Sequence, residues 1–152
     1  MTADRAGNQS EGEITPLRLP GNLDALPQIA TYVCQAATRA SLNYKSSYWL
    51  RLAVDEIATN IIIHGYTEAG QRGTLRLWSY WDDDYLAIVL EDRGITYDPV
   101  QASLPEKLDC PLQERQPGGL GIYLALWGVD EFYYEPLQNC NRSTFLVKRK
   151  ER

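Results

Sequence analysis

The stretch that most constrains the fold is residues 52–66, LAVDEIATNIIIHGY, which reads as a helix with apolar residues on every side. Within it, Asn60 follows Glu56 by four residues and His64 follows by four more, so the three form one slanting polar row at about 100° per residue. An apolar arc lies roughly opposite Glu56, and we expect this arc to pack against a sheet. The arc consists of Val54, Ile57, Ala58, Ile61 and Ile62.

The polar row has two interpretations. For Glu56 and Asn60 taken alone, a solvated helix face is favoured. Leu52 and Ile63 flank Glu56, however, so its carboxylate is expected to be partly desolvated, which raises its pKa and suits it to act as a base. The carbonyl oxygen of Asn60 is a suitable ligand for a hard cation such as Mg²⁺. For His64, a structural hydrogen bond is favoured over catalysis.

The composition excludes several classes of function. The net charge of −5 and the pI near 4.9 argue against direct nucleic-acid binding, which needs clustered Lys and Arg. No window approaches the apolar length of a membrane span, and the polar N-terminus lacks the apolar centre of a signal peptide. The three cysteines are widely spaced without a C-x-x-C, which favours reduced thiols in the cytoplasm. His64 is the only histidine, which excludes metal sites built on several histidines.

Hydrophobic periodicity along the chain predicts an α+β fold. We expect a flexible tail over residues 1–12 and a single domain over residues 13–152. The order of elements predicts a two-layer sandwich, in which an antiparallel-rich sheet carries helices on one face. The expected elements are an extended segment at 14–19, a helix at about 23–40 capped by Asn22 or Asp24, a helix from Asn43 to about Gly65, strands at 74–81 and 85–90, a short helix at 120–127, and strands at 131–135 and 143–148.

Asp92 and Gly94 follow the second of these central strands, in the stretch LEDRGITYDP. The carboxylate of Asp92 is suited to accept a hydrogen bond from an exocyclic amine in a closed pocket. Gly94, which has no side chain, would let a ring approach the backbone closely. An ordinary strand-ending turn is the alternative interpretation of both residues.

A second loop is rich in glycine. Gly118, Gly119 and Gly121 immediately precede the short helix, and backbone N–H groups at a helix N-terminus form a natural phosphate site. A flexible hinge is an equally good interpretation of these glycines alone. The long irregular segment before them is typical of an active-site lid or a disordered loop. Within it, Arg115 and Lys107 are either candidates to reach a terminal phosphate or solvated loop charges.

Three motifs in this order, E-x-x-x-N-x-x-x-H-G-Y, D-x-G-x-x-Y-D-P and G-G-L-G-I-Y, resemble the GHKL ATPase superfamily. More closely, they resemble the small anti-sigma factor serine kinases of bacteria, over residues 14–149. The resemblance implies a two-layer α/β sandwich with a mixed, mostly antiparallel sheet. It also implies that ATP lies between the long helices and a mobile lid, with Mg²⁺ as a second cofactor.

The resemblance assigns roles by position. One position departs from the superfamily, since Thr96 stands where many members have glycine. On the helix, Glu56 matches the catalytic base, Asn60 matches the Mg²⁺ ligand, and His64 matches a residue beside the pocket that is no phosphoacceptor. At the adenine end, Asp92 matches the residue that reads the adenine amino group, Gly94 the glycine beside it, and Thr144 a threonine that supports the adenine site. At the phosphate end, Gly119 and Gly121 match the phosphate-contacting glycines, and Arg115 matches a lid arginine near the γ-phosphate.

These roles imply a cytoplasmic Mg-ATP-dependent serine/threonine-protein kinase. In the family that it resembles, the kinase phosphorylates a serine on a small antagonist protein and regulates a sigma factor by partner switching, often as a homodimer. Two alternatives stay open: an ATP-binding switch protein without kinase activity, and a stand-alone ATP-binding module of a histidine kinase. The second would need a separate chain to supply a dimerisation helix and a phosphoacceptor histidine. Neither membrane attachment nor direct nucleic-acid binding is expected.

Overall fold

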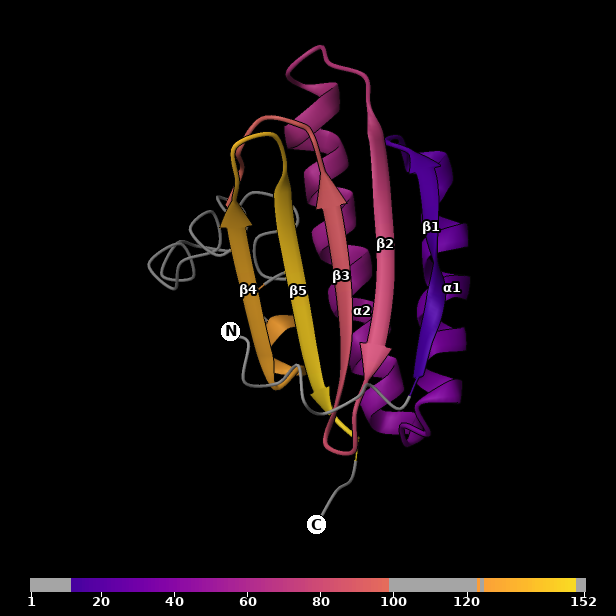
Figure 1. Ribbon diagram of the computed structural model, residues 1–152. Helices are drawn as coiled ribbons and strands as arrows, with labels where there is room; N and C mark the ends of the chain where they lie inside the picture. The colour runs from indigo at the N-terminus through magenta and orange to yellow at the C-terminus, as the bar shows by residue number, and fades with distance from the viewer. Residues whose placement is uncertain (1–11, 99–122, 124, 150–152) are drawn as a thin grey trace, which may run out of the picture.

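The structure of the protein is a computed structural model that describes residues 12–98, 123 and 125–149. Five strands form one sheet, and the two long helices lie together on one of its faces (Figure 1). The elements are β1 Gly12–Pro20, the 3₁₀ turn η2 Leu23–Ala25, α1 Leu26–Arg39, α2 Tyr44–Asn60, the π-helix η3 Ile61–Thr67, β2 Thr74–Trp81, β3 Tyr85–Asp92, β4 Glu131–Pro136 and β5 Asn141–Lys148. The α+β two-layer architecture is the one that the sequence predicts.

The strands follow the order β1-β2-β3-β5-β4, so β3 is central and β5 lies between β3 and β4. Each of the four pairings is antiparallel, whereas the resemblance implies a mixed sheet; the described strands contain no parallel pair. In the β3–β5 pairing, Asp92 lies opposite Asn141 and Leu90 lies opposite Ser143. This register brings the start of β5 beside the end of β3.

The core lies between the sheet and the helices. On β3, the side chains of Leu86, Ile88 and Leu90 are fully buried in the cluster that includes the helices. The apolar arc of α2 and η3 packs into the same cluster, which confirms that this face of the helix meets the sheet. Its members, Val54, Ile57, Ala58, Ile61 and Ile62, are each 2% exposed or less.

The second long helix begins as predicted and ends differently. The side chain of Asn43 accepts a hydrogen bond from the backbone N–H of Ser46 (2.7 Å) and so caps α2. Toward its C-terminal end the helix widens into η3, where the N–H of Glu68 donates to the carbonyl of Ile63 (2.8 Å), five residues back. The helical segment therefore continues to Thr67, beyond the end predicted near Gly65. The prediction missed this because α-helical periodicity does not anticipate a π-turn.

Other boundaries agree with the sequence predictions to within two residues at each strand end. The predicted tail lies outside the described residues, apart from Gly12, the first residue of β1. The segment predicted as a lid lies outside them as well. The helix predicted at 120–127 is described at Tyr123 and at residues 125–127, which are helical. In the described part of the chain, no helix has both the length and the apolar character that crossing a membrane requires.

Candidate functional site

The candidate site is built around Asp92, the last residue of β3, which is 2% exposed. Its Oδ1 accepts hydrogen bonds from the backbone N–H of Gly94 (3.0 Å) and from Nδ2 of Asn141 (3.0 Å). Its Oδ2 is also buried and has no hydrogen-bond partner among the described residues. Burial raises the pKa of Asp92, while the bonds from Asn141 and Gly94 act to lower it. A buried carboxylate oxygen without a donor is costly, so Oδ2 suits a ligand that brings an N–H group.

The segment that follows β3 is fastened to the π-helix through its backbone. The N–H of Arg93 donates to the hydroxyl of Tyr66 (2.7 Å), and the N–H of Ile95 donates to the carbonyl of Gly65 (3.1 Å). The wide turn of η3 thus offers a helix carbonyl to a partner outside the helix, as π-turns at functional sites often do. These bonds hold the C-terminal end of the helix layer against the end of β3.

Gly94 lies where this segment crosses the π-helix. A Cβ at Gly94 would lie 2.5 Å from the carbonyl oxygen of Gly65 and 2.8 Å from its carbonyl carbon, and these backbone atoms cannot rotate away as a flexible side chain could. The sequence interpretation gives Gly94 a close approach to a ligand ring. In the structure the close approach is to the backbone of Gly65, which by itself explains the glycine.

Asn141, at the start of β5, is a site residue that the sequence analysis missed. It is 3% exposed, and its Nδ2 donates both to Oδ1 of Asp92 and to the carbonyl of Gly94 (3.0 Å). Its Oδ1 accepts a hydrogen bond from the hydroxyl of Thr96 (3.2 Å). The pattern of residues gave no signal for it, because the expected strand starts only at Ser143 and leaves Asn141 in a turn. Only the pairing of β5 with β3 brings it to Asp92.

Thr144, the threonine that the resemblance places at the adenine site, does not reach Asp92. It lies opposite Val89, on the face of the sheet away from the core cluster. The neighbouring Ser143 lies opposite Leu90 on the face that also holds Asp92. The hydroxyl of Ser143 is fully buried and has no hydrogen-bond partner among the described residues. The role expected for Thr144 stays a prediction, and strand alternation places Ser143, one residue earlier, on the face that holds Asp92.

Glu56 and Asn60 lie on α2 and are both half-buried. Burial raises the pKa of Glu56, and the nearby charge of Asp55 raises it further, so the expected desolvation of this carboxylate is confirmed. The Nδ2 of Asn60 donates to the backbone carbonyl of Glu56 (2.9 Å). Because Nδ2 is held in this way, Oδ1 of Asn60 is the atom left to act as a ligand.

His64 is held by structural contacts. Its Nδ1 lies 2.6 Å from Oε1 of Glu68, one turn further along η3. Its ring stacks on that of Tyr97, with centroids 4.4 Å apart. The N–H of Tyr97 donates in turn to the hydroxyl of Tyr134 on β4 (3.0 Å). These contacts agree with the expectation of a structural role for His64, and they attach the segment after β3 to both layers.

The remaining predicted site residues, Arg115, Gly118, Gly119 and Gly121, lie outside the described residues, as does Lys107. Among the residues that the structure does describe, no group of three or more His, Cys, Asp or Glu is placed to hold a metal ion. Asn60 would thus be a single protein ligand, which is compatible with Mg²⁺ because this ion keeps waters and phosphate oxygens in most of its positions.

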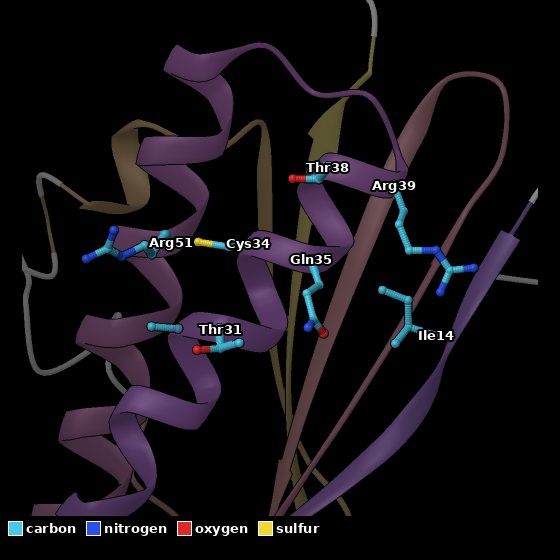
Figure 2. A pocket seen from close by; sticks show the side chains of 8 residues that line it. Ile14, Thr31, Cys34, Gln35, Thr38, Arg39 and Arg51 are labelled. Atoms are coloured by element: carbon cyan, nitrogen blue, oxygen red, sulfur yellow. The ribbon is translucent and has the colours of Figure 1, made fainter.

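A separate groove of about 820 Å³ lies on the outer side of α1 (Figure 2). Thr31, Cys34 and Gln35 project from the helix between Arg51 of α2 on one side and Ile14 of β1 on the other. The groove is open to solvent along its length and shares no residue with the site around Asp92. It therefore forms no part of the candidate site.

Two solved structures of histidine kinases are similar to this chain. The histidine kinase domain of the Erythrobacter litoralis EL346 blue-light activated histidine kinase is 18% identical, with a TM-score of 0.49. The match covers 83% of this chain and 60% of that chain, so this protein spans less than two thirds of its length. The Acinetobacter baumannii histidine kinase AdeS is 11% identical, with a TM-score of 0.49, over 97% of this chain and 74% of that chain.

Curated relatives and a family match say more than these solved structures about the family of this chain. A serine-protein kinase RsbW of Staphylococcus aureus is 25% identical over 149 residues, which cover 95% of this chain and 94% of that protein. The RsbW of S. aureus strain MRSA252 is 25% identical over 126 residues, which cover 81% and 79%. Residues 19–145 match the family described as Histidine kinase-like ATPase domain. Because this match takes in most of the chain, including Glu56, Asp92 and Asn141, the protein belongs to the histidine kinase-like ATPase domain family.

Proposed function

We propose that this protein is a Mg-ATP-dependent serine/threonine-protein kinase that phosphorylates a serine on a small antagonist protein. It thereby regulates a further partner, a sigma factor, by partner switching in the cytoplasm. Two findings support the proposal: the chain belongs to a family of ATPase domains, and curated relatives at 25% identity are named serine-protein kinases.

Glu56 is the observation that carries the kinase assignment. Its carboxylate is half-buried, its pKa is raised by that burial, and an amide stands one turn further along the same helix at Asn60. A raised pKa brings a carboxylate closer to the value that suits a general base near neutral pH. A protein that only binds nucleotide has no use for a base at this place, so Glu56 favours transfer over binding alone.

Asp92 and Ser143 supply the proposed base site. The buried Oδ2 of Asp92 accepts the N–H of the adenine amino group, and this bond removes the cost of leaving it unpaired. The buried hydroxyl of Ser143 is available to a second polar atom of the base. Burial of both groups excludes water, so a base that cannot complete these bonds is rejected.

The phosphate end of the nucleotide is assigned to residues on and beyond α2. Oδ1 of Asn60 is the proposed protein ligand for Mg²⁺. The chemistry that Mg²⁺ supplies when bound is neutralisation of the phosphate charge. Gly118, Gly119 and Gly121 contact the phosphates through their backbone N–H groups, and Arg115 lies near the γ-phosphate; both assignments rest on the resemblance alone.

In the proposed reaction, the Glu56 carboxylate takes the proton of the acceptor serine hydroxyl. The serine oxygen forms a bond to the γ-phosphorus while the bond from that phosphorus to the β,γ-bridging oxygen breaks, and ADP leaves with the electron pair. The products are phosphoserine, ADP and the proton on Glu56, which is then released to water. Positioning and charge stabilisation supply most of the catalysis in such transfers.

The test compares Glu56→Gln with Lys45→Gln, an exposed position on the same helix. Each protein is incubated with γ-labelled ATP, Mg²⁺ and a small antagonist protein, and phosphoserine is measured beside equilibrium ATP binding. Glu56→Gln is expected to lower transfer by about 10²-fold or more while ATP affinity is kept, and Lys45→Gln is expected to keep both. Full transfer by Glu56→Gln would remove the base assignment. If the wild-type protein binds ATP and transfers no label, the kinase assignment is wrong and an ATP-binding switch remains.

A further inference from the structure

A hydrogen-bond network joins the start of β5 to the segment after β3; Asp92 and Asn141 are buried in it, and Thr96 lies at its exposed end. Asn141 is its centre: its amide nitrogen donates to Oδ1 of Asp92 and to the carbonyl of Gly94, both at 3.0 Å. Its amide oxygen accepts from the hydroxyl of Thr96 at 3.2 Å. Both amide hydrogens are therefore used, and Asn141 is only 3% exposed.

The network fixes which way round the Asn141 amide lies. If the amide were turned over, its oxygen would face the Asp92 carboxylate and the Gly94 carbonyl, which are both acceptors. The amide nitrogen would then face the hydroxyl of Thr96. That hydroxyl is able to accept a hydrogen bond from the nitrogen, but it would no longer donate one to the amide oxygen. The arrangement with nitrogen toward Asp92 is the one in which every group finds a partner of the opposite kind.

This orientation of the Asn141 amide determines how the Asp92 carboxylate is rotated and which of its oxygens has donors. Two donors, the N–H of Gly94 and Nδ2 of Asn141, occupy Oδ1 and hold the carboxylate in one rotation. Oδ2 is left as the buried acceptor without a partner. A 6-amino purine brings a donor to that oxygen, whereas a 6-oxo purine brings a second acceptor, and two acceptors facing each other in a buried site repel.

We propose that Asn141, supported by Thr96, is a positioning residue that sets the Asp92 carboxylate for a 6-amino purine and thereby determines the preference of this chain for adenine over 6-oxo purine nucleotides. The inference rests on the proposed function, because it concerns the base site of the same nucleotide. Thr96 stands where many GHKL proteins have a glycine, which has no hydroxyl to donate to Asn141.

Asn141 has a second effect on Asp92. Its hydrogen bond lowers the pKa of the Asp92 carboxyl against the raising effect of burial. Without that bond, the carboxyl takes up a proton more readily and gains an O–H donor. A protonated Asp92 no longer repels a 6-oxo group, so loss of Asn141 weakens discrimination through the charge state as well as through the orientation.

The experiment measures dissociation constants of ATP and inosine triphosphate, each with Mg²⁺, by calorimetry on the full chain. The variants are Asn141→Ala, Thr96→Val and Thr96→Ser, and Asn139→Ala serves as a matched control because Asn139 is an exposed asparagine in the same β4–β5 hairpin. The wild-type protein is expected to prefer ATP by about a hundredfold or more. Asn141→Ala is expected to reduce this ratio by about tenfold or more and Thr96→Val by about threefold, while Thr96→Ser and Asn139→Ala keep it.

A readout on the protein without nucleotide separates positioning from general loss of structure. Carboxyl-carbon NMR titration is expected to give a higher pKa for Asp92 in Asn141→Ala than in the wild-type protein. An unchanged pKa overturns the proposal, as does a loss of affinity in Asn141→Ala that is equal for the two nucleotides. If Asn141→Ala fails to fold, Thr96→Val decides, and an unchanged ratio in that variant overturns the proposal.

The proposed function fails in a different way. If the wild-type protein binds neither nucleotide, or binds both equally, the base site itself is wrongly assigned and the inference falls with it. If the wild-type protein prefers ATP and the ratio survives in Asn141→Ala and Thr96→Val, only the inference is overturned and the ATP site stands.

Discussion

Asp92 is a buried carboxylate whose two oxygens are in different states, one with two donors and one with none among the described residues. Burial raises its pKa above the ordinary value of 3.8, so the folded protein binds this proton more tightly than the unfolded chain does. Between the ordinary pKa and the raised one, the free energy of unfolding therefore falls as pH rises. Above that window, the cost of the ionised group is present in full.

Asp92→Asn removes this cost and should stabilise the protein at neutral pH. The amide oxygen keeps the bonds from Gly94 and Asn141, and no charge is buried. We expect the free energy of unfolding without nucleotide to rise at pH 7, with a smaller gain as pH falls through the window. Urea denaturation at several pH values measures this free energy of unfolding, and Asp24→Asn at an exposed position is the control. A variant that is less stable at pH 7, or that still binds ATP normally, contradicts this account of Asp92.

Ser143 and Thr144 provide a matched pair, because they are neighbours on β5 that point to opposite faces of the sheet. Ser143→Ala removes a buried hydroxyl that has no partner among the described residues, so stability should hold or rise. ATP affinity should fall by about two- to tenfold, since the hydroxyl is assigned to the base. Thr144→Ala should leave ATP affinity unchanged. Calorimetric titration with ATP gives both values, and a loss confined to Thr144→Ala would restore the assignment made from the resemblance.

Secondary-structure elements were predictable to within two residues at most ends because their periodicity records which face meets the core. The apolar arc of α2 and the alternation of β2 and β3 are properties of single segments, so the sequence contains them directly. The π-helix η3 is different, since its wide turn is coupled to a hydrogen bond from Ile95, thirty residues after Gly65. The register of β5 also depends on a distant partner, so the sequence alone does not show that Ser143, and not Thr144, shares a face with Asp92.

The contact between η3 and the segment after β3 is tested by Gly94→Ala and Gly65→Ala. A Cβ at Gly94 would lie 2.5 Å from the carbonyl oxygen of Gly65. Because this oxygen belongs to the backbone, it cannot rotate out of the way as a side chain could. A Cβ at Gly65 would lie 3.6 Å from the carbonyl oxygen of Ile95, which is an ordinary van der Waals contact. We expect Gly94→Ala to cost about 1–3 kcal/mol of stability and to weaken ATP binding at least severalfold.

Gly65→Ala is the control for that substitution. Alanine is favoured over glycine in helices, so its free energy of unfolding should stay equal or rise slightly, and ATP affinity should be kept. Urea denaturation and ATP titration of the two variants measure the difference. Equal losses in both would mean that the close approach is not what makes glycine necessary at Gly94.

At the scale of the whole molecule, the sequence supplied the architecture and part of the site. The order of strands and helices was enough to predict the two-layer sandwich, and the spacing of three motifs was enough to propose Glu56, Asn60 and Asp92 as site residues. Asn141 was beyond reach because its role exists only across a strand pair whose members lie 49 residues apart. A site assembled between distant segments can be predicted residue by residue only where a family motif already marks it.

The two faces of the sheet are built differently. One face carries α1 and α2 and the apolar core (Figure 1). On the other, the ring of Trp78 lies beneath the guanidinium groups of Arg76 (4.9 Å) and Arg142 (5.4 Å). Val89, directly opposite Trp78 in the β2–β3 pairing, is 5% exposed although no described helix covers this face. Among the described residues, the helices thus supply the core on one face, and Trp78 with its two arginines lies on the other, open face.

Leucines on neighbouring strands test this asymmetry. Leu86 of β3 is fully buried under the helices, whereas Leu146 of β5 is half-buried on the open face, opposite Ala87. Leu86→Ala should cost about 2–5 kcal/mol, because it leaves a cavity in the core. Leu146→Ala should cost roughly 1 kcal/mol, because solvent fills the space. Urea denaturation of the two variants measures the contrast, since the residue type and the deleted atoms are the same. Equal losses would mean that in solution the open face is covered as fully as the helix face, and the asymmetry would then be absent.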